Sequence, residues 1–149
     1  MFEQVRYDAL NARQKELFNF QKLAATLADY GFNCIKLADD WQGADFLAYH
    51  AKDTKTLKIQ LKSRITIQKK YRQKDLWIAF PHKGFWYLIE HDLLVTKVRE
   101  HTDWLQSDSW ETKNGYSSGS INPDLLNSLA ENKLGPVYGP ILEETDEPI

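Results

Sequence analysis

In residues 57–62 the apolar side chains Leu57, Ile59 and Leu61 alternate strictly with polar ones. Successive side chains of a β-strand point to opposite faces of its sheet, so the alternation predicts a strand with one buried face. Gln60 and Lys62 then share the other face. Residues with turn chemistry at 52–55 come before this strand, and the largely apolar segment 44–50 comes before the turn. The two segments together predict a β-hairpin.

A helical pattern precedes the hairpin. Between residues 8 and 30 apolar side chains recur at steps of three, four and seven, which is typical of an amphipathic helix. Asp8 is expected to cap the start of this helix, and Gly31 to end it. A short strand is predicted over residues 32–37, and residues 38–43 are predicted to be a loop.

The second half of the chain adds strands and helices. Strands are predicted at 76–80 and 85–90, and helices from about 92 to 105 and from about 123 to 132. Residues 65–74 fit either a strand or a short helix. We therefore predict an α/β (α+β) fold, with an N-terminal helix, a mixed sheet of about five strands and C-terminal helices.

The charges are unevenly distributed along the chain. The formal net charge is −2, but four acids lie in the last seven residues. Residues 1–134 are predicted to be a single domain, followed at 135–149 by an acidic, flexible tail.

Residues 58–75, in contrast, hold seven basic side chains against one acid. This basic run predicts contacts to a nucleic-acid backbone, with a solvated charged face as the alternative. The side chains predicted to make these contacts are Arg64, Lys69, Lys70 and Arg72, and Tyr71 is predicted to stack on a base.

Three polar groups are expected to converge at one end of the hairpin. A turn centred within 52–55 would place Asp45 opposite Lys62 and Leu47 opposite Gln60. Cleavage of a phosphodiester needs a hard cation, oxygen ligands to hold it, and a group that positions water. Asp45, the Gln60 side chain and the Leu61 carbonyl could be the ligands. The Lys62 ammonium could orient the water or stabilise the charged phosphate.

Asp45, followed after a turn by Gln60, Leu61 and Lys62, resembles motifs II and III of the PD-(D/E)xK nuclease superfamily in its QxK form. That superfamily includes restriction endonucleases, junction resolvases and repair nucleases. Its core places a helix before a three-stranded hairpin sheet, and the resemblance covers about residues 8–90. It implies a restriction-endonuclease-like core for this chain.

The resemblance also implies an acid on the preceding helix that reaches the metal site. Glu16 is the best match, and Gln21 is the alternative. Two positions depart from the family pattern. Ala44 stands where a proline is common, and Gln60 replaces an acid, which removes one negative charge from the metal site.

The function implied is a divalent-metal-dependent endonuclease that hydrolyses phosphodiester bonds in DNA with Mg²⁺ or Mn²⁺. RNA is not excluded as the substrate. The alternative is an inactive nuclease-fold protein that binds nucleic acid or a protein partner. A symmetric homodimer would double the site for cutting two strands.

Other patterns narrow the class of protein. The N-terminus lacks an apolar run of signal-peptide length, and no stretch approaches about 18 apolar residues, so we predict a cytoplasmic protein without a membrane partner. Cys34 is predicted to be a small buried side chain. The four histidines lack the spacing of a zinc site. Asp39 and Asp40 could add a metal ligand, with a solvated loop as the alternative.

Overall fold

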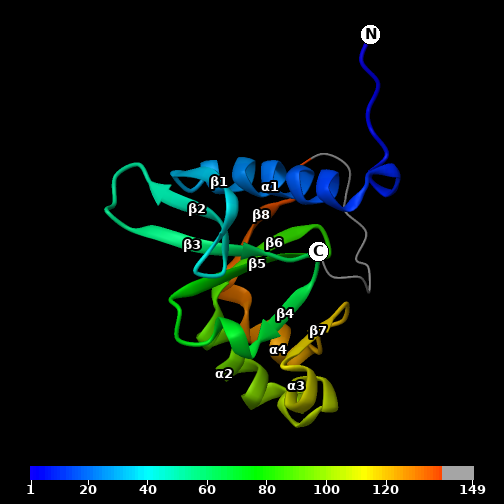
Figure 1. Ribbon diagram of the computed structural model, residues 1–149, viewed down its shortest axis with the longest axis vertical. Helices are drawn as coiled ribbons and strands as arrows, with labels where there is room; N and C mark the ends of the chain where they lie inside the picture. Colours follow the sequence, from blue (N-terminus) through cyan, green and yellow to red (C-terminus); the bar gives the residue numbers. More distant parts are fainter. Residues whose placement is uncertain (139–149) are drawn as a thin grey trace.

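The computed structural model describes residues 1–138, which form a mixed α/β fold with an N-terminal helix, a six-stranded mixed sheet and C-terminal helices (Figure 1). This confirms the predicted fold class. The helices are α1 (Ala12–Ala28), α2 (His91–His101), α3 (Asp108–Lys113) and α4 (Pro123–Ser128), and the short 3-10 turns are η1 (Tyr7–Ala9), η2 (Lys69–Tyr71), η3 (Trp104–Gln106) and η4 (Ala130–Asn132). The strands are β1 (Phe32–Trp41), β2 (Ala44–His50), β3 (Thr56–Leu61), β4 (Ile65–Gln68), β5 (Leu76–His82), β6 (Phe85–Glu90), β7 (Gly115–Ser118) and β8 (Lys133–Pro136).

The main sheet has the strand order β1-β2-β3-β5-β6-β8. Its neighbouring strands are antiparallel except for β3 and β5, which run parallel. A parallel pair needs a crossover connection, and here residues 62–75 supply it through β4 and η2. The segment at 65–74, which the sequence left open, is therefore a short strand followed by a 3-10 turn. β4 pairs with β7 in a separate two-stranded sheet.

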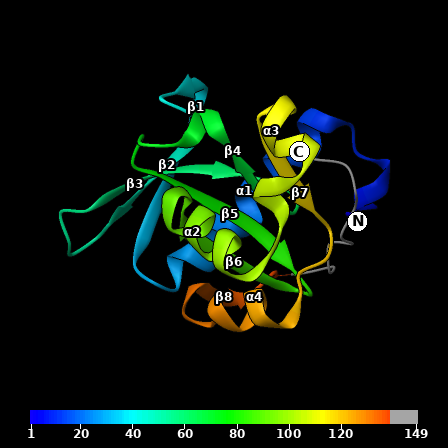
Figure 2. The ribbon, with the colours of Figure 1, turned by 90° about the horizontal axis from the view of Figure 1, so that it is seen from below.

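Helices cover both faces of the main sheet. Figure 1 shows α1 above the sheet and α2, α3 and α4 below it, and Figure 2 shows the same layers from the side of α2. Each face has its own apolar core. Leu57, Ile59 and Leu61 pack beneath α1, as the alternation predicted, whereas Ile78 and Leu94 belong to the core on the α2 side.

α1 begins at Ala12 rather than near Asp8. The Asn11 side chain accepts a hydrogen bond from Gln14 N at 2.8 Å, and the Gln14 side chain accepts one from Asn11 N at 2.9 Å. This capping box satisfies main-chain N–H groups that Asp8, in η1, does not reach. Gly31 ends the helix as predicted, with a φ of +87° that a glycine adopts without strain.

The β2–β3 hairpin differs in register from the prediction. Leu47 pairs with Lys58 instead of Gln60, so by extension Asp45 lies opposite Gln60 rather than Lys62. The reason is the His50 ring, whose Nδ1 accepts hydrogen bonds from Lys52 N and Asp53 N and so closes the turn earlier. A shift of two residues keeps every side chain on its predicted face.

β1 is longer than predicted and continues through the expected loop to Trp41. Only Gln42 and Gly43 form the turn into β2, and both have positive φ values, +52° and +87°. A Cβ atom at Gly43 would lie 3.3 Å from a methyl group of Leu76, so a side chain has little room there. This tight turn brings the end of β1 beside the start of β2.

The C-terminal part of the domain extends beyond the predicted boundary at residue 134. Residues 135 and 136 lie in β8, and Val137 is buried in the core and donates a main-chain hydrogen bond to Gly84. Residues 139–149 of the predicted tail lie outside the described residues.

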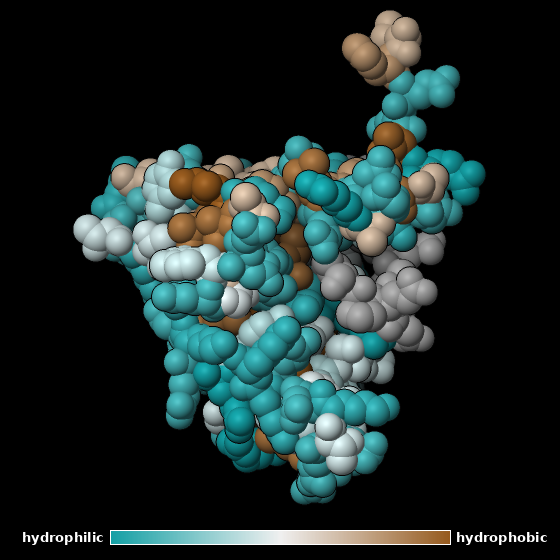
Figure 3. Space-filling view, viewed as in Figure 1, coloured by the Kyte–Doolittle hydropathy of each residue, from teal (hydrophilic) through white to brown (hydrophobic). Residues whose placement is uncertain are grey.

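No helix within residues 1–138 is long and apolar enough to cross a membrane. In Figure 3, apolar atoms reach this face of the molecule mainly in its upper part, and the lower part is mostly hydrophilic.

Candidate functional site

The predicted site residues come from the open end of the β2–β3 hairpin. Asp45 is the second residue of β2, and Lys62 directly follows the last residue of β3. Because the two strands are antiparallel, the start of one lies beside the end of the other. Lys62 N donates a hydrogen bond to Ala79 O at 2.9 Å, which holds its main chain against β5.

Asp45 is half-buried and held by the main chain of β3. Its Oδ2 accepts a hydrogen bond from Leu61 N at 2.9 Å, and within residues 1–138 no donor contacts its Oδ1. Burial raises the pKa of the Asp45 carboxyl, and the nearby charge of Asp40 raises it further. The Leu61 hydrogen bond and the cations of Lys36 and Lys62 act in the opposite direction.

Lys62 is almost fully buried, with 7% of its surface exposed. In the part of the chain that the structure describes, its ammonium has no hydrogen-bond acceptor and no ion-pair partner, and it lies 5.7 Å from the centroid of the Tyr71 ring. Burial lowers the pKa of Lys62, whereas the charge of Asp45 favours the ammonium form. Asp45 and Lys62 thus interact through space without direct contact.

Gln60 is also nearly buried, at 8% exposure. Its main chain pairs with Ile78 of β5, and its amide makes no side-chain hydrogen bond to any described residue. An amide oxygen in this state is available to a ligand. Leu61 N donates its hydrogen bond to Asp45, and the Leu61 side chain packs in the core beneath α1.

Glu16 reaches the same place from α1. With Asp45 and Leu61 it lines a small pocket of about 10 Å³, roughly the space needed for one water molecule. Lys36 of β1 lines this pocket too. The charge of Glu16 also acts on Lys62. Gln21, the alternative, does not line the pocket and is exposed on α1.

Asp40 is a further part of the site that the sequence placed in a loop. Its charge acts on Asp45, Lys62 and Tyr71. The signal that could have located it is the pair Gln42–Gly43, because a two-residue turn forces the preceding residues to lie beside Asp45. Lys36 could have been found in the same way, since it pairs with Phe46, the residue after Asp45.

The prediction that Tyr71 stacks on a base is wrong. Tyr71 is 4% exposed and packs in the core on the α2 side. Its ring lies near the ammonium groups of Lys62 and Lys70, at 5.7 Å and 5.4 Å from the centroid. The ring edge-packs against His91 at 5.5 Å. The Tyr71 ring therefore lies in the core, next to the Lys62 ammonium, and does not face solvent.

The four basic side chains predicted to contact nucleic acid have different surroundings. Lys70 is exposed beside Tyr71, on the side of Lys62. Arg64 donates hydrogen bonds from Nε and Nη2 to the Ser117 hydroxyl of β7. Lys69 and Arg72 instead line a separate pocket next to α2.

The donors available to a cation are few. Among residues 1–138, no group of three or more His, Cys, Asp or Glu side chains is arranged to hold a metal ion. Of the predicted ligands, Asp45 and Leu61 line one pocket together with Glu16, whereas Gln60 is placed near them only by its register opposite Asp45. Mg²⁺ is commonly held by one or two carboxylates, with water and substrate phosphates completing its shell. Two carboxylates, Asp45 and Glu16, are the number of acids that such an ion commonly takes from a protein.

Comparison of the chain with protein-family models, with curated proteins and with solved structures gives no match.

Proposed function

We propose that the protein is a divalent-metal-dependent endonuclease-like hydrolase of phosphodiester bonds in DNA, in line with its resemblance to PD-(D/E)xK nucleases. The observation that carries the proposal is the burial of the Lys62 ammonium without a partner among the described residues. A buried ammonium is unfavourable unless it is paired, yet among residues 1–138 Lys62 has neither an acceptor nor a counter-ion in contact. Such a group beside a half-buried carboxylate is typical of a site that is completed by its ligand.

Asp45 and Gln60 would hold the cation, and Glu16 would reach it from α1. The bound cation would supply Lewis-acid stabilisation of the phosphate. Lys62 donates hydrogen bonds to the attacking water and to a non-bridging phosphate oxygen, so its charge offsets the charge that develops there. The water oxygen bonds to phosphorus as the bond to the leaving sugar oxygen breaks. The water loses a proton to solvent, and the leaving oxygen gains one.

The test is cleavage of linear duplex, single-stranded and branched DNA by purified protein with Mg²⁺ or Mn²⁺. We expect Lys62→Ala to lower the cleavage rate by at least about 100-fold, the usual effect of removing one group that stabilises a transition state. Lys55→Ala is the control. Lys55 is exposed in the hairpin turn, at the other end of the hairpin from Asp45, and its ammonium lies 5.1 Å from the centroid of the Trp77 ring. Equal activity of wild type and Lys62→Ala would refute the proposal.

Within residues 1–138 no three acidic side chains are arranged to hold a metal ion, and this favours a second candidate function, a nuclease-fold protein that binds nucleic acid without cutting it. DNA binding that persists with no cleavage under either metal would support this alternative. Absence of DNA binding at low salt would exclude both.

A further inference from the structure

A hollow between η2 and α2 is separate from the Asp45–Lys62 site. It has a volume of about 510 Å³ and lies between η2, the turn that follows it, and one face of α2. The α2 face contributes residues three or four positions apart, as expected for one side of a helix. The polar residues that line the pocket are Lys69, Arg72, Gln73, Asp92, Thr96 and Arg99.

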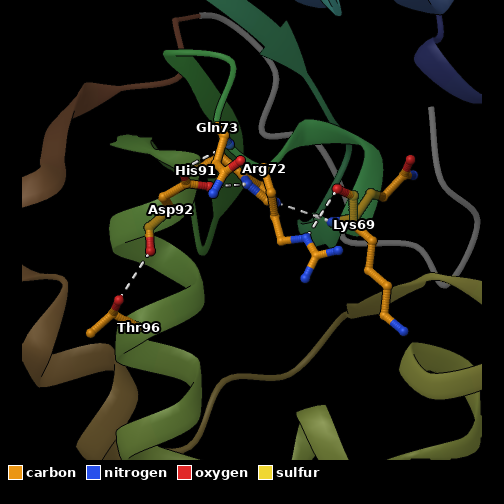
Figure 4. Close-up of polar contacts among 7 residues, drawn as sticks. Lys69, Arg72, Gln73, His91, Asp92 and Thr96 are labelled. Carbon is orange, nitrogen blue, oxygen red and sulfur yellow. Dashed lines mark hydrogen bonds and ion pairs between the residues drawn. The ribbon is translucent and has the colours of Figure 1, made fainter.

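The pocket carries an excess of positive charge. Its three cations face one carboxylate, that of Asp92, and this carboxylate is already engaged (Figure 4). Asp92 Oδ2 accepts a hydrogen bond from Gln73 N at 3.0 Å, and Oδ1 lies 3.2 Å from His91 Nδ1. In residues 1–138 neither Lys69, Arg72 nor Arg99 forms an ion pair. The side chains that line the pocket therefore carry two more positive charges than negative ones.

The cations are partly fixed before any ligand binds. Arg72 Nε donates a hydrogen bond to Lys69 O at 3.2 Å, which orients the guanidinium and leaves its two terminal nitrogens to other acceptors. The Lys69 ammonium donates a hydrogen bond to Glu111 O at 3.4 Å and lies 5.5 Å from the centroid of the Trp110 ring. Thr96 Oγ1 donates to Asp92 O, within α2. Forked guanidinium donors match the geometry and charge of phosphate oxygens.

η2 joins this pocket to the candidate active site. Lys70 and Tyr71, on one side of the turn, lie next to Lys62, whereas Lys69 and Arg72 face the pocket. A DNA strand that leaves the candidate active site over η2 would therefore meet the pocket next. Gln73, at the pocket edge, also lines a second hollow with Lys58, Lys74 and Asp75.

We propose that Lys69, Arg72 and Arg99 bind a backbone phosphate of DNA at a distance from the bond to be cut. The choice of DNA as ligand rests on the proposed function, whereas the anion preference of the pocket does not. Arg99 adds a contact from α2 that lies far along the sequence from the basic run at 58–75.

The test measures binding of a fluorescent DNA oligonucleotide at several salt concentrations, with EDTA present so that no strand is cut. Each phosphate contact contributes about 0.9 to the slope of log affinity against log salt. We expect Arg72→Gln with Arg99→Gln to weaken binding at least about 10-fold and to reduce the slope by about 0.9, the share of one phosphate. The control Arg13→Gln removes one exposed charge from α1, on the opposite face of the sheet, and should change neither value beyond about twofold.

The outcomes separate this proposal from the catalytic one. Cleavage that depends on Lys62, together with wild-type DNA affinity in the Arg72/Arg99 variant, would overturn the phosphate pocket and leave the nuclease standing. Weakened DNA binding in that variant, without cleavage by the wild type, would support the pocket and refute the enzyme. Inorganic phosphate is the probe for a free-anion site. If it binds as tightly as the oligonucleotide and loses affinity equally in the variant, the pocket serves a small phosphate ligand and the DNA-backbone proposal is wrong.

Discussion

Leu61 N donates a hydrogen bond to Oδ2 of Asp45 across 2.9 Å, which ties the last residue of β3 to the second residue of β2. The bond lets a half-buried carboxylate persist in the folded protein, but burial still raises its pKa above the ordinary value of 3.8. The folded state therefore holds the Asp45 proton more tightly than the unfolded chain does. Stability from this group is present at acid pH and is lost as the pH rises through the raised pKa.

Asp45→Asn should consequently stabilise the protein at neutral pH. The amide keeps an oxygen to accept from Leu61 N and carries no charge to bury, so we expect the free energy of unfolding at pH 7 to rise by about 1 kcal/mol. The gain should vanish by about pH 3, where the wild-type carboxyl is protonated. Urea denaturation at both pH values measures this. A variant that is less stable than wild type at pH 7, or a gain that persists at pH 3, would contradict it.

His91 should make stability fall on mild acidification. Its Nε2 accepts a hydrogen bond from Gln68 N at 3.1 Å, which requires an unprotonated nitrogen, and burial lowers the pKa of His91 below 6.5 even though Asp92 opposes this. The unfolded chain then binds the proton first as the pH falls. Below about pH 6.5 the wild type should lose up to about 1.4 kcal/mol of stability per pH unit until the lowered pKa is reached.

His91→Gln should flatten that slope between pH 7 and pH 5, as measured by denaturation curves at each pH. The control is His101→Gln at the end of α2, where the side chain is about one-third exposed, and it should keep the wild-type slope. An equal slope in His91→Gln and wild type would exclude His91 as the source.

Gly43→Ala should damage the site through its turn. Positive φ costs a non-glycine residue about 1–2 kcal/mol, and the new methyl would also press on Leu76 at 3.3 Å. Gly84→Ala is a matched control, because Gly84 has a φ of +83° but no atom within 4 Å of the added Cβ. We expect both variants to lower the melting temperature, and only Gly43→Ala to reduce cleavage, since only that turn positions Asp40 against Asp45. Equal cleavage by the two variants would mean that the turn does not set the site.

Glu16→Gln should raise the Mg²⁺ concentration needed for half-maximal cleavage. Glu16 lines the pocket with Asp45, and loss of a supporting carboxylate commonly weakens metal binding by about 10-fold or more. Gln21→Ala, elsewhere on the same helix, should leave the Mg²⁺ dependence unchanged. Metal titrations of the cleavage rate compare the two, and a larger effect from Gln21→Ala would reverse the assignment.

The elements that the sequence predicted well are those with local signals. The alternation around Ile59, the helical repeat before Gly31 and the turn chemistry at 52–55 each depend on neighbouring residues, and each element is present. The register of the hairpin was missed because the His50 ring closes the turn, and no periodicity reports a side chain bonding to the main chain.

The surroundings of the candidate site depend on contacts between distant segments, which one sequence does not reveal. Tyr71 lies within a basic run and so was predicted to be exposed, but the crossover from β3 to β5 carries it into the core. Arg99 belongs to another element and joins Lys69 and Arg72 only because α2 packs beside η2. Local charge density identified the basic segment but did not show which side chains share a pocket.

η2 is only three residues long, so it holds the phosphate pocket and the candidate active site close to each other. Lys69 and Tyr71 are separated by a single residue, so a phosphate on Lys69 would lie close in the chain to the ring that the Lys62 ammonium faces. In the proposed complex, the negative charge of a phosphate seated against Lys69 and Arg72 would favour the ammonium form of Lys62. Thermodynamic reciprocity then requires that the charge state of Lys62 change the affinity for that phosphate by the same factor.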